Sequence, residues 1–170
     1  AFRGCTSLTS VVIGDSVTSI GAGAFYNCNS LTSVVIPDSV TSIGSNAFQY
    51  CYKLVEVINH SSLNIQAGSS NYGYVAYYAK EVHNGESKIV NKDDYLFYTY
   101  EGTNYLFGYL GNETVLTLPE SYNGENYEIY KNAFRGCSSL TSVEIPNSVT
   151  SIGQSAFVHC TSLKNVIIPD

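Results

Sequence analysis

The chain has 170 residues, of which 44% are hydrophobic, and this is enough apolar surface to bury the core of one domain. Its formal net charge of −6, with eight Lys and Arg residues, argues against nucleic acid and anionic membrane as partners, because both attract clustered positive charge. The apolar runs are far shorter than the roughly 18 residues of a membrane span, so no membrane insertion is expected.

One 23-residue unit, A-F-x-x-C-x-x-L-x-x-V-x-I-P-x-S-V-T-x-I-G, recurs along the chain. Its five copies start at Ala1-Phe2, Ala24-Phe25, Ala47-Phe48, Ala133-Phe134 and Ala156-Phe157. A period of this size predicts a solenoid in which each copy forms one coil. Because the chain opens and closes inside a copy, we expect it to be a piece of a longer array.

Each copy contains three predicted elements. The L-x-x-V-x-I segment predicts a strand stacked in parallel on the next coil, with Val11 inward, Val12 outward and Ile13 inward. A proline such as Pro37 then ends the strand, because proline cannot donate to the ladder. The S-V-T-x-I-G segment predicts a second short strand closed by a turn glycine. The A-F-x-x-C segment predicts one tight helical turn that places Ala and Phe inward.

The third copy departs from the pattern after Ile58, which predicts an insertion over about residues 59–114. Gly68-Ser69-Ser70 can cap a helix, which Asn84-Gly85 would end after about three turns. Apolar side chains recur between them at helical spacing, at Val75, Tyr78, Ala79 and Val82.

Two aromatic segments follow, residues 95–100 and 105–110, and the turn residues between them predict a β-hairpin. Residues 115–119 then fit V-x-I-P, so the repeat resumes in a degenerate coil over about residues 115–132. Four additional residues, 123–126, predict a turn inside that coil.

The repeat unit resembles the 23-residue leucine-rich repeat of BspA-like bacterial surface proteins, and the five copies cover about two thirds of the chain. The resemblance implies an α/β leucine-rich repeat solenoid with a curved parallel β-sheet on its concave side. We therefore expect one solenoid domain over residues 1–170, with regular repeats at 1–58 and 133–170. The resemblance also implies export to the extracellular space or the bacterial surface, and adhesion to host extracellular matrix or to another cell surface.

Candidate chemistry is sparse. The five cysteines share one repeat column, so their spacing comes from the coil period and predicts buried free thiols. Gly14-Asp15-Ser16 resembles the start of one hydrolase family, but the same column reads Pro37-Asp38-Ser39, so the serine is interpreted as a turn residue. The three histidines lack metal-ligand spacing. The sequence therefore predicts a protein that is not an enzyme, with no catalytic, metal or cofactor site.

Two features stand out as candidate binding surfaces. The first is the outward strand column Val12, Val35 and Ile58, flanked by Ser10, Ser33 and Glu56. Its apolar stripe is equally compatible with a docking site and with β-formers that only fill a ladder.

The second feature is the set of tyrosines in the predicted hairpin, which either contact a ligand or pack in the core. These are Tyr95, Tyr98, Tyr100, Tyr105 and Tyr109.

The leading hypothesis is a non-catalytic binding domain that presents its repeat-built face to a protein partner. Two alternatives remain open at this stage: a glycan-binding module that uses the hairpin tyrosines, and a purely structural spacer.

Overall fold

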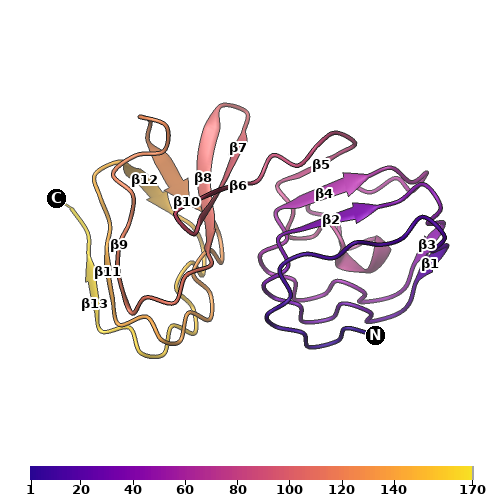
Figure 1. Cartoon of the computed structure of the whole chain (residues 1–170), viewed down its shortest axis with the longest axis horizontal. Coiled ribbons are helices and arrows are strands. Elements are labelled where there is room, and N and C mark those ends of the chain that lie inside the picture. The colour runs from indigo at the N-terminus through magenta and orange to yellow at the C-terminus, as the bar shows by residue number, and fades with distance from the viewer. Residues whose placement is uncertain (170) are drawn as a thin grey trace. The chain divides into compact units, whose positions relative to one another are not determined.

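The computed structural model describes residues 1–169 and contains two compact units, residues 1–87 and residues 88–170. Both are built from stacked coils whose strands pair in parallel with the strands of the next coil (Figure 1). The predicted leucine-rich repeat architecture with parallel sheets is therefore confirmed, whereas the curvature of the sheet and the single-domain organisation stay predictions.

Unit 1 comprises residues 1–87 and has two parallel sheets. The first contains β2 (Ser33–Ile36), β4 (Glu56–Asn59) and β5 (Glu81–His83), in that order. The second contains β1 (Ser19–Ile20) and β3 (Ser42–Ile43). Each regular coil thus supplies the two extended segments that the repeat predicts, the second of them very short.

Inward side chains of successive coils stack into ladders that form the core of unit 1. The Phe25 and Phe48 rings stack with their centroids 5.0 Å apart, and Phe2 stacks on Phe25 at 5.4 Å. The cysteine column forms a second ladder, in which the Cys28 Sγ–H donates to the Phe2 carbonyl and the Cys51 Sγ–H donates to the Phe25 carbonyl. Ladder positions that have a neighbouring coil on both sides, such as Phe25, Cys28, Phe48 and Cys51, are therefore buried.

The predicted helix over about residues 70–84 is wrong. The segment contains only a 3₁₀ turn, η1 (Tyr72–Tyr74), and then the strand β5, which extends the sheet of β4 in parallel. The backbone of this segment bonds to the neighbouring coil: the Gly73 carbonyl accepts from the Phe48 N–H at 2.7 Å, and the Lys80 N–H donates to the Val55 carbonyl at 2.7 Å. The backbone of the neighbouring coil satisfies these groups in place of the i→i−4 bonds of a helix.

Gly73 lets the coil that contains η1 and β5 approach the preceding coil closely. A Cβ atom at this position would lie 2.3 Å from the Gly44 carbonyl oxygen, and the φ of Gly73 is +65°. Only glycine combines this close approach with a left-handed backbone.

The A-F-x-x-C corners are also not helices. They are runs of turns with i→i+3 bonds, such as the Cys28 N–H to the Phe25 carbonyl at 3.1 Å, and bonds to the next coil interrupt them. The predicted inward placement holds, since Ala47 and Phe48 are both fully buried.

Unit 2 begins with residue 88. Its larger sheet contains β12 (Val149–Ile152), β10 (Tyr127–Ile129), β8 (Thr103–Tyr109), β7 (Tyr95–Tyr100) and β6 (Val90–Lys92), in that order. Its smaller parallel sheet contains β13 (Asn165–Ile167), β11 (Ser142–Glu144) and β9 (Val115–Thr117).

The second half of the interruption contains the predicted hairpin, and parallel strands follow it. Strands β7 and β8 form the predicted antiparallel hairpin. The degenerate coil supplies β9 and β10, which pair in parallel with β11 and β12 of the next coil. Its additional residues form a turn in which the Tyr122 N–H donates to the Glu125 carbonyl at 2.9 Å.

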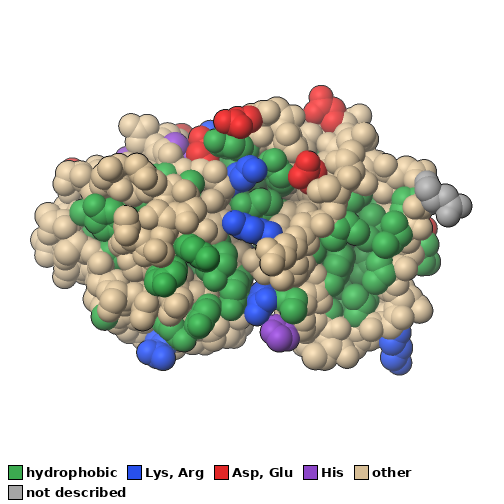
Figure 2. Space-filling view, turned by 180° about the vertical axis from the view of Figure 1, so that it is seen from behind, with side chains coloured by type: hydrophobic (Ala, Val, Ile, Leu, Met, Phe, Trp, Pro, Cys, Tyr) green, Lys and Arg blue, Asp and Glu red, His purple; other side chains and the backbone are tan. Residues whose placement is uncertain are grey.

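The core of unit 2 follows the same ladder principle as unit 1. Phe134 is fully buried and stacks on Phe157 with ring centroids 5.0 Å apart. The hairpin enters this core through Phe97, whose ring stacks on Tyr122 at 4.2 Å. Figure 2 shows hydrophobic side chains gathered on the surface of this unit, at the right of the view, and Ile167 of β13 is 56% exposed.

Candidate functional site

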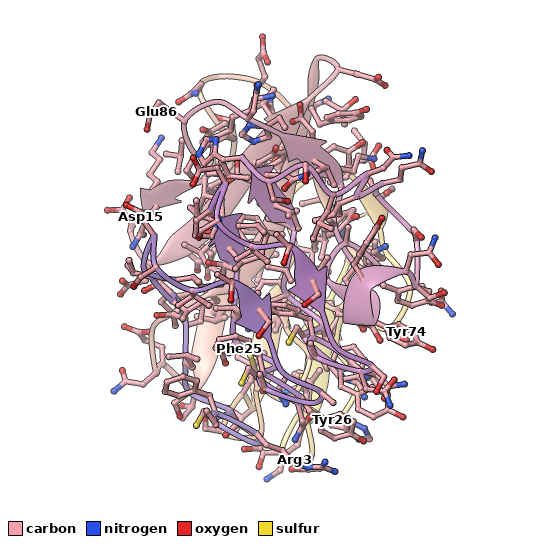
Figure 3. All side chains as sticks on the ribbon, turned by 90° about the vertical axis from the view of Figure 1, so that its right-hand side faces the viewer. Arg3, Asp15, Phe25, Tyr26, Tyr74 and Glu86 are labelled. Atoms are coloured by element: carbon pink, nitrogen blue, oxygen red, sulfur yellow. The ribbon has the colours of Figure 1, made fainter. Side chains whose placement is uncertain are left out.

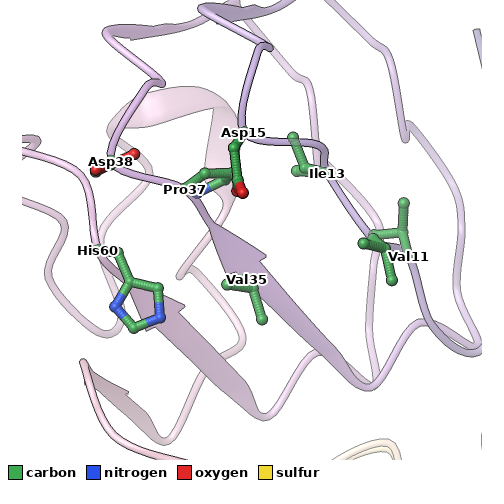
Figure 4. Close-up of a pocket in the computed structure, with 8 residues that line it drawn as sticks. Val11, Ile13, Asp15, Val35, Pro37, Asp38 and His60 are labelled. Carbon is green, nitrogen blue, oxygen red and sulfur yellow. The ribbon is translucent and has the colours of Figure 1, made fainter.

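A groove of about 540 Å³ lies on unit 1 over the outward side of β2 (Figure 4). Its floor is apolar. The lining comes from three successive coils and consists of Val11, Val12, Ile13, Asp15, Val35, Pro37, Asp38 and His60. Because equivalent positions of successive coils lie side by side, the repeat itself aligns these side chains into one groove.

Two valines of the predicted outward column are the exposed aliphatic side chains of this groove. Val12 is 94% exposed and Val35 is 38% exposed. The inward neighbours of Val35, Val34 and Ile36, are buried, which confirms the predicted in–out alternation of the strand.

Polar side chains, two of them carboxylates, flank the apolar floor. Asp15 and Asp38 occupy the same column of successive repeats, and His60 follows β4 in the third coil (Figure 4). This column was predicted to contain turn residues, and its carboxylates were not expected to form part of a surface. The signal was present in the sequence, because Asp15 and Asp38 follow their outward valines at the same interval.

The serines of the same column have the predicted turn role. The Ser39 hydroxyl donates to the Val17 carbonyl of the preceding coil at 2.8 Å. This hydrogen bond connects two successive coils, so the hydroxyl of Ser39 stabilises the stacking of the coils.

Two other residues of the predicted stripe do not belong to an exposed surface. Glu56 is fully buried, and Ile58 is only 6% exposed. The reason is β5, which places Glu81 beside Glu56 and His83 beside Ile58 in the parallel register. Of the flanking serines, Ser10 is exposed and Ser33 is half-buried.

Glu56 binds two side chains of the segment that follows β4. One carboxylate oxygen lies 3.0 Å from His83 Nε2, and the other accepts a hydrogen bond from the Ser87 hydroxyl at 2.6 Å. The carboxylate stands between the serine and the histidine, so Ser87 bonds to Glu56 rather than to an imidazole base. This arrangement differs from a nucleophile paired directly with its base.

The five candidate tyrosines of the hairpin do not form one exposed platform. Tyr98 is fully buried, so it offers no face to a ligand. Tyr95 is half-buried, donates its hydroxyl to the Thr117 carbonyl at 3.2 Å and packs against the ring of Tyr109. Burial raises the pKa of Tyr95. Tyr105 packs edge-on against Tyr130, and Tyr100 is half-buried.

All five cysteines are free thiols, but the column is not uniformly buried. Cys28 and Cys51 are buried between coils, and burial raises the pKa of Cys51 to about 12. Cys5 is exposed, and Cys137 and Cys160 are half-buried. The expectation of five buried thiols therefore holds for Cys28 and Cys51 and is wrong for Cys5.

Among residues 1–169, no group of three or more His, Cys, Asp and Glu side chains is arranged to hold a metal ion. Over the same residues, the helices are all too short to cross a bilayer.

Comparison with solved structures finds bacterial repeat proteins. A leucine rich cell surface protein from Faecalibacterium prausnitzii is 27% identical, with a TM-score of 0.50, and the match covers 96% of this chain and 48% of that protein. A leucine-rich repeat protein from Bacteroides ovatus is also 27% identical, with a TM-score of 0.31, and the match covers 94% of this chain and 37% of that protein. The chain thus spans less than half the length of these two proteins. No curated protein matches the chain.

The family comparison covers nearly the whole chain. The model of the BspA type leucine rich repeat region matches in six copies over residues 1–100 and 103–170. The resemblance noted from the sequence is therefore confirmed, and the match extends through the interruption. The chain belongs to the family of BspA type leucine rich repeat regions.

Proposed function

We propose that this chain is a non-catalytic binding domain of a bacterial cell-surface protein, and that unit 1 binds a protein partner in the groove over β2. The bound segment is an extended peptide that carries an aliphatic side chain and a Lys or Arg residue. The aliphatic group covers Val12 and Val35, and the cation lies near Asp15 and Asp38.

The observation that carries this proposal is the groove over β2, in which the partly exposed Val35 lies with Val12 and the carboxylates of Asp15 and Asp38. Contiguous apolar surface bordered by charge is typical of interaction sites. The flanking carboxylates favour a cationic group on the partner, because complementary charge orients the encounter. A location on the cell surface accords with the F. prausnitzii relative, which is a cell surface protein.

The test begins with a displayed library of random peptides selected on the immobilised protein. Calorimetry then measures the affinity of the selected peptides for the parent and for the double variant Val12→Thr/Val35→Thr. Threonine keeps the β-forming shape but removes apolar contact, at about 0.8 kcal/mol per buried methyl or methylene group. We expect the double variant to bind about tenfold more weakly, since a tenfold change corresponds to about 1.4 kcal/mol.

A charge variant tests the second half of the groove. Asp15→Asn/Asp38→Asn should weaken the same peptide and flatten the dependence of its affinity on salt, because screening acts on the removed charges. For the valine variants, Val115→Thr is the matched control. It replaces an exposed strand valine of unit 2 with threonine and should leave the affinity of the peptide unchanged.

Three results contradict the proposal. In the first, the selected peptides show no preference for aliphatic or basic residues. In the second, both double variants bind the peptides as tightly as the parent does. In the third, neither peptides nor extracellular matrix proteins bind, and the spacer hypothesis takes the place of this one. The glycan hypothesis based on the hairpin tyrosines loses support, because Tyr98 is buried.

A further inference from the structure

Six tyrosines of unit 1 form a continuous chain of ring contacts, which we name the tyrosine ribbon. Neighbouring ring centroids lie 5.0 to 5.7 Å apart. In order of contact, its members are Tyr26, Tyr50, Tyr52, Tyr78, Tyr77 and Tyr74. They come from three successive coils, so the ribbon runs along the stacking direction of the unit.

The ribbon is a surface feature rather than a part of the core. Tyr50 is 36% exposed and Tyr77 is 42% exposed, and the other members are half-buried. In Figure 3, Tyr26 and Tyr74 lie on the side of the unit opposite to Asp15, which lines the groove described above. The ribbon is therefore a surface separate from that groove.

Tyr50 is unusual for its place in the repeat. The residue before each cysteine has a left-handed backbone, and the column contains Gly4, Asn27, Tyr50, Gly136 and His159, with Tyr50 at φ 66°. Glycine and asparagine adopt this conformation readily and histidine is also enriched there, whereas for a large aromatic residue it is an outlier. Strain of this kind, at a ring that stays 36% exposed, is found often at functional positions. Tyr74 has the same φ of 66°.

A polar groove of about 340 Å³ adjoins the first ring of the ribbon. It is lined by Arg3, Ala22, Gly23, Tyr26, Ser45, Asn46 and Gln49. The guanidinium carbon of Arg3 lies 4.2 Å from the centre of the Tyr26 ring. Amide, hydroxyl and guanidinium groups supply several donors and acceptors beside the aromatic surface.

From this combination we propose that the tyrosine ribbon is a binding site for a linear carbohydrate chain of neutral hexose units. A pyranose ring has a face of C–H groups and a rim of hydroxyls. Its C–H face packs on the electron-rich face of an aromatic ring, and its rim requires both donors and acceptors. The tyrosines supply the rings, and Asn46, Gln49 and Arg3 supply the hydrogen bonds.

The extent of the ribbon explains why the ligand is a chain. Its six rings contact one another in series across three coils, so it offers several contact positions in a row rather than one enclosed pocket. Amides and hydroxyls, which both donate and accept, match the neutral hydroxyl groups of hexoses.

The test uses purified linear hexasaccharides of glucose, in both α and β linkage, and of mannose. Binding to the whole chain is measured by calorimetry and by saturation-transfer NMR, which reports the sugar protons that touch protein. A proline-rich peptide serves as a second probe, because polyproline helices also dock on aromatic surfaces. We expect at least one hexasaccharide to bind, with transfer to its ring C–H protons, and the peptide not to bind.

Tyr50→Asn is the decisive variant. Asparagine is the residue of this column at Asn27, so the variant should fold and its thermal midpoint should stay or rise as strain is relieved. We expect it to bind the hexasaccharide at least fivefold more weakly, as should Tyr77→Ala. His159→Asn is the control: it introduces the same residue in the same column outside the ribbon and should leave binding unchanged.

Either of two results overturns the proposal. In the first, none of the hexasaccharides binds at millimolar concentration, whether or not the peptide does. In the second, a hexasaccharide binds, but Tyr50→Asn and Tyr77→Ala bind it as tightly as the parent.

Discussion

The phenylalanine ladder of unit 1 predicts a graded series of stabilities. Its members Phe2, Phe25 and Phe48 stack in order, and their exposed fractions are 46%, 6% and 0%. Truncation of a buried Phe to Ala costs about 3–5 kcal/mol from lost transfer energy and the cavity left behind. Phe48→Ala should therefore lower the free energy of unfolding by about 4 kcal/mol, Phe25→Ala by slightly less, and Phe2→Ala by about 1 kcal/mol.

Urea denaturation followed by far-ultraviolet circular dichroism measures these differences. With a slope of about 2 kcal/mol per molar urea, a loss of 4 kcal/mol moves the midpoint by about 2 M. Phe134→Ala is the matched control, because Phe134 occupies the same ladder position in unit 2 and is also fully buried. Each ladder should stabilise the unit that contains it, so Phe134→Ala should lower the stability of unit 2.

Equal effects of Phe2→Ala and Phe48→Ala would refute the reasoning. That result would mean that stacking between successive coils does not bury these rings in the order the structure gives. A total loss of folding in Phe48→Ala, with Phe25→Ala and Phe2→Ala graded as expected, would still agree with it, since small units have only about 5–15 kcal/mol to lose.

Three further predictions concern the coil corners and the buried ionisable groups. Gly44→Ala should lower stability by about 1–3 kcal/mol, because the new Cβ would lie 2.5 Å from the Ala22 nitrogen, whereas Gly21→Ala has open space and should be neutral in the same urea titration. A thiol reagent at pH 8 should modify the exposed Cys5 quickly and reach the buried Cys51 only on unfolding, and fast labelling of both in native protein, read by mass spectrometry, would contradict this. Burial raises the pKa of Cys51 from 9.0 to about 12 and the pKa of Tyr130 from 10.0 to about 12, so these groups ionise in the unfolded chain first. Their contribution to stability is complete below about pH 9 and is lost as the pH rises toward 12, and a urea midpoint that stays constant from pH 8 to 11 would disprove this.

Much of the fold follows from the sequence, because the period of the repeat and its inward columns determine how the coils stack. A 23-residue period with inward Phe, Cys and Leu columns has few ways to bury those columns other than stacking one coil on the next. The hairpin was also predictable, because β7 and β8 are aromatic-rich runs around a short polar turn. Local patterning and the tertiary structure agree at these elements.

The candidate site was less predictable. The outward valines Val12 and Val35 follow from strand alternation, and both line the groove. The burial of Ile58 and Glu56 does not follow from alternation, because it depends on which segment covers the edge of β4. The tyrosine ribbon depends in the same way on the stacking of coils. Tyr26, Tyr50 and Tyr77 come from three different coils, and they join one chain of ring contacts only when these coils stack.

The sequence by itself determined the coil, its inward columns and its turns, because each copy repeats the same local instructions. Only the tertiary structure decided which secondary structure residues 70–84 adopt. Their apolar spacing suited a helix, and Val75 and Ala79 are indeed buried, but β4 presented an unpaired edge whose backbone groups required partners. Pairing along that edge satisfied both segments at once, so Glu81–His83 became β5. A backbone hydrogen-bond requirement of a neighbouring coil therefore outweighed the local helical pattern.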